Sequence, residues 1–244
     1  AIAALNAAGR PVFALDLPSG LDGDRGVALG AAVRADATIT FVARKCGLYL
    51  ADGPQFVGQL YCDDLQLPPA SGAAAQPVLE LLDETDLARA LPQREHGAHK
   101  GDFGRLLLIA GGPGMAGAAR LAGEAALRCG AGLVSVATAP ENVSAIVAGR
   151  PELICFGAGD PGALGAPLAA ATIVAVGPGL GQSAWARALL DAALGSGKPL
   201  VLDADALNLL AASGRVPPAG TIITPHPGEA GRLLGVSSES IQND

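Results

Sequence analysis

The chain has 244 residues, which suffices for one large domain or two small ones, and half of them are hydrophobic. Aromatic residues make up only 3%, so we expect a core of aliphatic side chains and closely packed backbones. With 16 basic and 23 acidic residues, the net charge is −7, and no basic stripe is available to neutralise a nucleic-acid backbone. We therefore expect no nucleic-acid partner.

The sequence also predicts no membrane segment. The longest uncharged run, residues 161–186, is interrupted by glycines and prolines, and residues 1–9 lack the basic start and apolar stretch of a signal peptide. The cysteines show neither CxxC spacing nor the density of a disulfide framework. We expect buried, reduced thiols in a cytoplasmic protein, with a reactive thiol at Cys46 as the less favoured alternative. The four residues are Cys46, Cys62, Cys129 and Cys155.

The first part of the chain contains few predicted elements. A helix is expected at residues 1–8, and strands are expected at 12–15, 37–42 and 58–62. These elements cannot close a doubly wound sheet alone, so we expect the amino-terminal portion of a larger domain to be absent. A stretch rich in proline, alanine, serine and glycine follows, and it predicts a linker at residues 69–80.

The segment Asp16-Leu17-Pro18-Ser19-Gly20 carries the candidate chemistry of this first part. A carboxylate at the carboxyl end of a buried strand can meet a substrate, so Asp16 is a candidate acid or base. Ser19 offers a hydroxyl group to a substrate or a cation. The structural alternative for Asp16 is a capping carboxylate, and the nearby Asp22 and Asp24 are interpreted as turn residues.

The second part begins with a charged segment, residues 82–91, that predicts a helix. A loop with two histidines, a lysine and three glycines follows at residues 96–104. Zinc binding by His96 and His99 is not favoured, because no matching cysteine or carboxylate cluster accompanies them. Lys100 could reach an anionic group such as a phosphate, although an exposed loop lysine is the more common outcome.

Four apolar runs in the second part share one arrangement. Each ends abruptly in a loop that contains glycine, aspartate or histidine, and then continues into a helical pattern. Such runs are typical of strands buried on both faces of a parallel sheet, whose ligands bind beyond the carboxyl ends of the strands. We therefore expect the four loops to line one edge of the sheet and to form a small-molecule site. The runs are residues 106–119, 172–181, 199–208 and 221–230.

The first two of these loops are rich in glycine. Residues 111–114 precede a helix predicted at 115–129, whose first turn contains small residues that include Ala118. Backbone N–H groups at such a helix start favour an anion, and small side chains allow a ligand to approach closely. The formal GxGxxG spacing is only a weak signal of dinucleotide binding, because no acidic residue follows on a second strand. The loop at residues 177–181, with Gly179 at its centre, repeats the arrangement.

The last two loops carry polar side chains. Asp203 follows a strand at residues 200–202 and is expected to face the edge of the sheet, whereas Asp205 is expected to cap a helix at 206–210. His226 lies between two prolines that fix its position. It is interpreted either as a functional residue or as a structural histidine that bonds a nearby carbonyl.

Taken in order, these segments resemble the bifunctional NAD(P)H-hydrate repair enzymes, in which an epimerase domain is fused to an ADP-dependent dehydratase domain. Each motif alone is weak, but the ordered set spans nearly the whole chain. The resemblance implies an α/β protein. Residues 1–68 would be the C-terminal part of the Rossmann-like epimerase domain, and residues 81–244 the N-terminal part of a ribokinase-like, three-layer dehydratase domain. The matching segments are residues 16–23, 35–47, 99–104, 115–119, 177–181, 203–207 and 224–229.

The resemblance also implies an activity and its site. The epimerase would interconvert the two stereoisomers of NADH or NADPH hydrate, with Asp16 binding substrate or handling a proton and Ser19 near a potassium ion. The dehydratase would restore the reduced cofactor while ADP is cleaved to AMP and phosphate, with magnesium as a further candidate ion. The expected partners are the hydrate and an adenine nucleotide, within a homo-oligomer. The candidate residues for holding the hydrate in the dehydratase are Ala118, Gly179, His226 and Asp203.

The chain also departs from the family pattern. The family's K-G-x-x-T nucleotide loop and its G-x-G-D motif have no counterpart before Asp244, so we expect an internal fragment of an enzyme. Two alternatives stay open. One is a ribokinase-like small-molecule kinase, against which the segment 16–20 and the Pro-His-Pro-Gly-Glu loop argue. The other is a non-catalytic binding module, which would be favoured if the chain is truncated in the cell.

Overall fold

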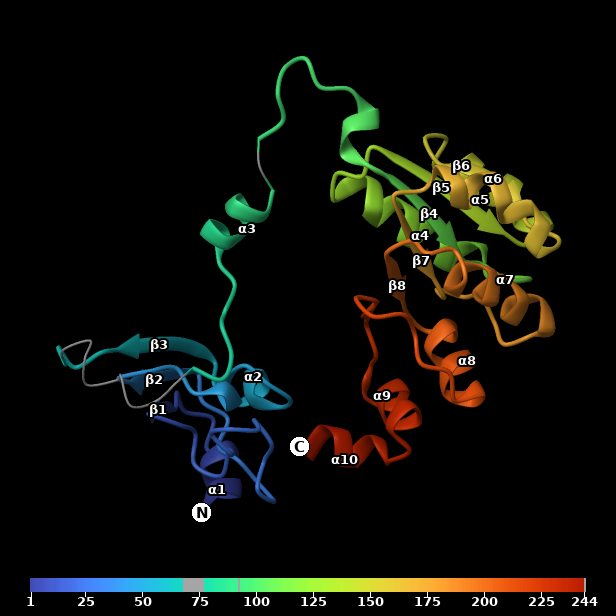
Figure 1. Ribbon diagram of the computed structural model, residues 1–244. Coiled ribbons are helices and arrows are strands. Elements are labelled where there is room, and N and C mark those ends of the chain that lie inside the picture. Colours follow the sequence, from blue (N-terminus) through green and yellow to red (C-terminus); the bar gives the residue numbers. More distant parts are fainter. Residues whose placement is uncertain (68–76, 92, 244) are drawn as a thin grey trace. The chain divides into compact units, whose positions relative to one another are not determined.

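A computed structural model describes residues 1–67, 77–91 and 93–243. Contacts divide the chain into two compact parts (Figure 1), unit 1 with Ala1–Gln93 and Gln242–Asp244, and unit 2 with Arg94–Ile241. Of the predicted linker at 69–80, residues 69–76 lie outside the described part, and residues 77–80 form neither helix nor strand. Among the described residues, no helix has the length and apolar composition needed to cross a membrane.

Unit 1 contains a three-stranded parallel sheet in the order β1-β2-β3. The three predicted strands are confirmed to within one residue at each end. The sheet packs on a small apolar cluster of Leu21, Ala32, Leu48 and Val57. The elements are α1 (Ile2–Asn6), β1 (Phe13–Leu15), β2 (Ala37–Phe41), η1 (Cys46–Leu48), α2 (Gly53–Phe56), β3 (Gln59–Asp63) and α3 (Glu84–Ala90).

Unit 2 is built on a six-stranded sheet in the order β6-β5-β4-β7-β8-β9, and every neighbouring pair of strands is parallel. Because the strands are parallel, their carboxyl ends all lie at one edge of the sheet. The strands are β4 (Arg105–Ile109), β5 (Leu133–Thr138), β6 (Ile154–Gly157), β7 (Ile173–Val176), β8 (Leu200–Leu202) and β9 (Ile222–Ile223). The loops after β4, β7, β8 and β9, which the sequence predicts to line one edge, therefore follow four adjacent strands.

Helices cover both faces of this sheet. Alternate residues of β4 belong to two different apolar clusters: Leu107 packs with residues of α7 and α8, whereas Leu108 packs with residues of α4 and α5. The predicted three-layer α/β fold is confirmed. The larger helices are α4 (Ala116–Arg128), α5 (Val143–Gly149), α6 (Gly165–Ala170), α7 (Ala184–Leu194), α8 (Asp205–Ser213), α9 (Pro227–Leu234) and α10 (Ser238–Asn243), and the shorter turns are η3 (Lys100–Phe103), η4 (Pro140–Asn142) and η5 (Pro161–Leu164).

The core of the described residues is aliphatic, as the composition predicts, since its buried hydrophobic side chains are alanine, valine, leucine and isoleucine. Close packing is visible at Gly123 of α4, where an added Cβ would lie 2.9 Å from a methyl group of Leu153. A larger residue would require the Leu153 side chain to shift.

Two expectations about burial are wrong. Ile222 and Ile223 of β9 are exposed, because β9 lies at the edge of the sheet and pairs, among the described strands, with β8 alone. The four cysteines are free thiols but not buried ones: Cys62 and Cys129 are exposed, and the other two are partly buried. Partial burial raises the pKa of the Cys155 thiol.

Candidate functional site

The glycine loops after β4 and β7 contact each other at the edge of the sheet. Gly112 N–H donates to the carbonyl oxygen of Gly179 at 2.6 Å, and Gly111 N–H donates to that of Pro178 at 3.0 Å. A Cβ atom added to Gly179 would lie 2.7 Å from the Cβ of Ala118. The structure thus brings Ala118 and Gly179 into direct proximity, and both positions have to be small for the two loops to meet.

Two buried polar side chains support the first glycine loop, and the sequence interpretation missed both. Thr138 Oγ1 donates to Gly111 O at 2.6 Å, while Asn142 Nδ2 donates to Gly111 O at 3.0 Å and to Gly112 O at 2.8 Å. Both residues follow or end β5, the neighbour of β4 in the sheet. Their position after an adjacent strand was the only available signal, because isolated Thr and Asn residues form no motif.

The loop after β8 holds its backbone in a strained conformation. Ala204 has φ +47°, a value that L-residues other than glycine rarely adopt. Asp203 Oδ1 accepts the Ala204 N–H at 2.8 Å, and the Asp203 N–H donates to Val176 O in β7. The side chain of Asp203 is therefore fixed at the end of β8 and is only partly buried.

Asp205 does not cap α8, so that prediction is wrong. The helix begins after Ala204, which makes no side-chain cap, and Asp205 is the first helical residue. Its Oδ2 instead accepts the N–H of Gly181 at 2.8 Å, which ties the loop after β7 to the start of α8. The physical reason is that the neighbouring loop supplies an N–H donor, the one of Gly181, which the local sequence does not reveal.

His226 caps the helix that follows it. Its Nδ1 accepts the N–H of Gly228 at 3.0 Å, while its own N–H donates to Glu229 Oε2 at 3.0 Å. The second oxygen, Oε1, lies 3.2 Å from His226 Nε2. His226 thus has the structural role of a helix cap, but its partner is a backbone N–H group and not the nearby carbonyl that this alternative expected. The imidazole remains 62% exposed, whereas the Glu229 side chain is 6% exposed.

The four helices that start at this edge differ in how their first N–H groups are satisfied. Ser183 caps α7 and His226 caps α9, but neither α4 nor α8 has a side-chain cap. Free N–H groups at a helix start favour anionic or carbonyl ligands. The N–H groups of Ala206 and Leu207 in α8 already donate to the carbonyl oxygens of Asp203 and Ala204, both at 3.0 Å. The start of α4 is thus the place at this edge where the backbone can donate to a ligand.

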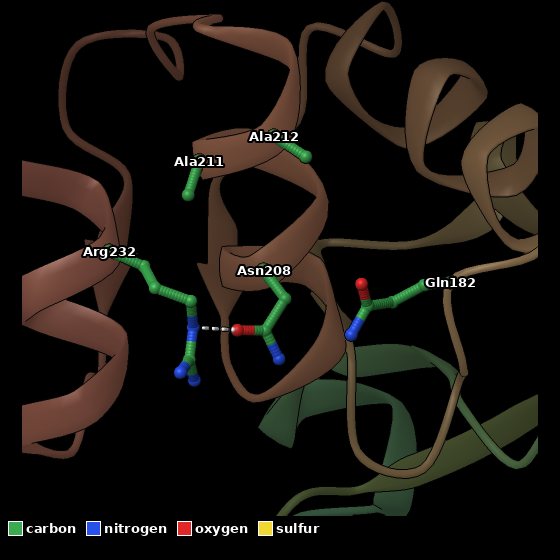
Figure 2. A pocket seen from close by; sticks show the side chains of 5 residues that line it. All are labelled: Gln182, Asn208, Ala211, Ala212 and Arg232. Atoms are coloured by element: carbon green, nitrogen blue, oxygen red, sulfur yellow. Dashed lines mark hydrogen bonds between the residues drawn. The ribbon is translucent and has the colours of Figure 1, made fainter. Parts of the chain in front are cut away.

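A pocket of about 500 Å³ lies beside this edge (Figure 2). The side chains of Gln182, Asn208 and Arg232 are directed towards it, and Ala211 and Ala212 complete its lining. Arg232 Nε donates to Asn208 Oδ1 at 2.8 Å. None of these residues was singled out from the sequence.

In unit 1, Asp16 lies at the centre of a polar cluster. Its Oδ1 accepts from Lys45 Nζ, from Thr40 Oγ1 at 3.1 Å and from Phe41 N–H at 3.2 Å. Lys45 also donates to Thr40 Oγ1 and Phe41 O, both at 2.9 Å. The hydrogen bond from Lys45 is the main reason that the pKa of Asp16 is lowered, against a smaller opposing contribution from burial.

Asp16 is therefore an ionised carboxylate at neutral pH and caps no helix, so the capping alternative is wrong. Its backbone has φ +66°, a strained value for a residue with a side chain. Lys45 was not recognised as its partner from the sequence, because 29 residues separate the two. Ser19 has an exposed side chain, and its carbonyl oxygen accepts the N–H of Val33. The interpretation of Asp22 as a turn residue is confirmed by its bonds to the N–H groups of Asp24 and Arg25.

The histidine loop of residues 96–104 contains the short helix η3, and His99 is the residue that precedes this helix. His99 Nδ1 accepts the Gly101 N–H, and Asp102 accepts the His99 N–H. Lys100 is exposed. No group of three or more His, Cys, Asp or Glu side chains arranged for a metal ion occurs within residues 1–67, 77–91 and 93–243.

Two family models match the two parts of the chain. The family model described as "NAD(P)H-hydrate dehydratase" matches residues 106–244, and the model described as "YjeF-related protein N-terminus" matches residues 1–47. The bifunctional NAD(P)H-hydrate repair enzyme of Coxiella burnetii is 48% identical over 243 residues, which make up 100% of this chain and 50% of that protein. The chain thus spans about half the length of this curated relative.

Solved structures resemble the chain over two thirds of its length. A hypothetical protein from Streptococcus mutans has a TM-score of 0.62 and 34% identity, covering 66% of this chain and 59% of its own. The ADP/ATP-dependent NAD(P)H-hydrate dehydratase from Bacillus subtilis, co-crystallised with ATP and Mg²⁺, has a TM-score of 0.56 and 33% identity, covering 66% and 58%. From its sequence, its parallel six-stranded sheet and these matches, the chain belongs to the NAD(P)H-hydrate dehydratase family.

Proposed function

We propose that this chain is part of a nicotinamide-cofactor repair enzyme, which epimerises NADH or NADPH hydrate and dehydrates the S form at the expense of ADP. Residues 1–68 would contribute to the epimerase and residues 81–244 to the dehydratase, joined by the linker at 69–80. One observation carries the dehydratase proposal. Four adjacent parallel strands present Ala118 with Gly179, Asp203 and His226 at the same edge of one sheet.

The small residues at this edge are suited to a flat ring. Ala118 and Gly179 are both small, and the exposed side chain of Met115 lies beside Gly179, so a nicotinamide ring could lie against these residues. His226 would contact the hydrate through its exposed ring, and Asp203 would accept a hydrogen bond from a ligand hydroxyl.

The same edge fits the phosphates of an adenine nucleotide. A hydroxyl group leaves a ring more easily once it is phosphorylated, and such a transfer requires donors that stabilise the charge on the moving group. The uncapped N–H groups at the start of α4 are donors of this kind. Magnesium would bind together with the nucleotide, through its phosphate groups.

The cluster around Asp16 supports the epimerase part. Because Asp16 is ionised and only its Oδ1 is engaged by Lys45, Thr40 and Phe41, the carboxylate can accept a hydrogen bond or a proton from substrate through Oδ2. Ser19 exposes a hydroxyl oxygen, the type of ligand that an alkali cation prefers, and we assign it to the potassium ion. We also propose a homo-oligomer in the cytoplasm, where free thiols persist.

The test is to incubate the full-length protein that contains this chain with the S form of NADH hydrate and ADP, and to follow the return of the reduced-nicotinamide absorbance. The proposal expects reduced cofactor and AMP in equal amounts. Substitution of Gly179 by Val should abolish this reaction, because a side chain there meets Ala118. A small-molecule kinase would leave the hydrate unchanged, and a binding module would bind the hydrate without turnover, so either result contradicts the proposal.

A further inference from the structure

Asn142 stands at the start of α5 but does not cap that helix. An asparagine in this place usually caps the helix with its side-chain oxygen, whereas here the side chain makes no cap hydrogen bond. The residue is instead 5% exposed, and its Nδ2 donates to Gly111 O at 3.0 Å and to Gly112 O at 2.8 Å in the loop after β4. A residue that gives up its local role for a distant contact is a candidate for a functional role.

The two bonds fix the orientation of the Asn142 amide. Both partners are carbonyl oxygens, which only accept hydrogen bonds, so the NH₂ group faces them and each of its hydrogens is used. Gly111 O has a second side-chain donor, Thr138 Oγ1, at 2.6 Å. Gly112 O otherwise accepts from the N–H of Met115, a residue of its own loop, at 2.9 Å. Among the described residues, Asn142 is thus the one group outside the loop that holds the Gly112 carbonyl.

The position of this loop determines the position of α4. The N–H of Gly112 donates to Gly179 O at 2.6 Å, so the loop is held from one side by Asn142 and from the other by the loop after β7. A Cβ added to Gly111 would lie 2.9 Å from the Cβ of Ala119 in α4, so the loop and the helix are in direct contact. A movement of the loop would therefore move the start of α4 relative to Gly179. Preorganised donors stabilise a developing charge only at their correct distance from it.

We propose that Asn142 is a positioning residue of the dehydratase site. It acts through the first glycine loop, because it holds the Gly112 carbonyl from the side of β5 and thereby fixes the uncapped N–H groups at the start of α4 in one orientation towards the ligand. Thr138 supports the same loop but binds Gly111 O, one residue further from the helix. This inference rests on the proposed function, which supplies the reaction that the loop serves.

Steady-state kinetics of the full-length protein that contains this chain, with the S form of NADH hydrate and ADP, test the proposal. Asn142→Ala should lower kcat by about tenfold and leave the KM of both substrates within about twofold, because the displaced donors act on charge that develops during the transfer. Asn142→Asp should lower kcat by about a hundredfold, since a carboxylate oxygen would face two carbonyl oxygens. The matched control is Thr172→Val, which removes hydrogen bonds to Arg105 at the amino end of the same strand, β4, and should leave kcat within about twofold of wild type.

Hydrogen exchange, read by mass spectrometry on the peptide that contains Gly112, follows the loop independently of the reaction. This peptide should exchange about tenfold faster in Asn142→Ala than in wild type, and at the wild-type rate in Thr172→Val. Unchanged exchange in Asn142→Ala, unchanged kcat in both Asn142 variants, or an equal loss of kcat in Thr172→Val would each overturn the proposal. If the wild type leaves the hydrate unchanged, the proposed function fails, and the exchange rate alone decides whether Asn142 fixes the loop.

Discussion

Two loops of unit 2, at His99 and at His226, begin a helix with the same four-residue pattern, His-x-Gly followed by an acid. In each loop the imidazole Nδ1 accepts the glycine N–H and the acid accepts the histidine N–H. Their surroundings differ, because the Asp102 side chain is 50% exposed and that of Glu229 only 6%. The same local arrangement is thus a surface cap in one place and a buried support of the candidate site in the other.

The largest expected difference between the two loops concerns the acid. Glu229→Ala should lower the free energy of unfolding by about 2–3 kcal/mol, because it removes a cap and leaves a buried space, whereas Asp102→Ala should cost about 0.5–1 kcal/mol. Urea unfolding measures this difference, with the fluorescence of Trp185 as the signal. Trp185 is the single tryptophan and lies in unit 2. Equal losses in the two variants would show that burial does not distinguish the loops.

The next difference concerns the histidine. Asparagine is a good N-cap residue, so His226→Asn and His99→Asn should both keep the stability within about 0.5 kcal/mol of wild type. Only His226→Asn should weaken the binding of the nicotinamide hydrate, by about tenfold if one ligand hydrogen bond is lost. Calorimetry with the hydrate measures this effect. If His226→Asn binds the hydrate with unchanged affinity, His226 serves only as a helix cap and does not contact the ligand.

A smaller effect is expected from the glycines. A Cβ added to Gly228 would lie 2.9 Å from His226 Cε1, and one added to Gly101 would lie 3.1 Å from His99 Cε1. Gly228→Ala should therefore displace the imidazole and cost about 1 kcal/mol, with a smaller cost for Gly101→Ala. Nitrogen NMR of the two rings reports whether Nδ1 still accepts a hydrogen bond. An unperturbed His226 ring in Gly228→Ala would contradict the geometry.

The smallest effect is expected from a third capping box, at the start of α3, which uses Asp83 in place of histidine. The N–H groups of Asp86 and Thr85 lower the pKa of Asp83 below its ordinary value of 3.8. A depressed pKa means that the cap stabilises the fold above pH 3.8 and that this contribution is lost as the pH falls through the lower, folded value. Carboxyl NMR titration tests the sign, and a midpoint at or above 3.8 would contradict it.

Much of the local structure was predictable from the sequence. The strands of unit 1, the strands β4, β7, β8 and β9 of unit 2, the helices after the glycine loops and the three-layer fold follow from apolar runs and turn residues, which act over a few positions. The strands β5 and β6 were not predicted. The candidate residues Ala118, Gly179 and His226 were chosen from short motifs that follow strands, and their roles stay predictions.

Other contacts could not be predicted, because they join residues far apart in the chain. Lys45 reaches Asp16 only because β1 and β2 are neighbours, and Asp205 turns from its own helix to Gly181 because β7 and β8 are neighbours. The support of Gly111 by Thr138 and Asn142 has the same origin. A sequence pattern carries no information on which of several donors or acceptors a side chain will bond.

The sequence by itself thus determined which segments become strands, where each one ends and which residues follow it, because backbone preferences and hydrophobic periodicity are local properties. Only the tertiary structure decided the order of the strands, and with it the side-by-side position of the four loops, the partner of each polar side chain and the pocket at Arg232. The physical reason is that these features depend on packing between elements, and packing selects among contacts that are equally compatible with the local sequence.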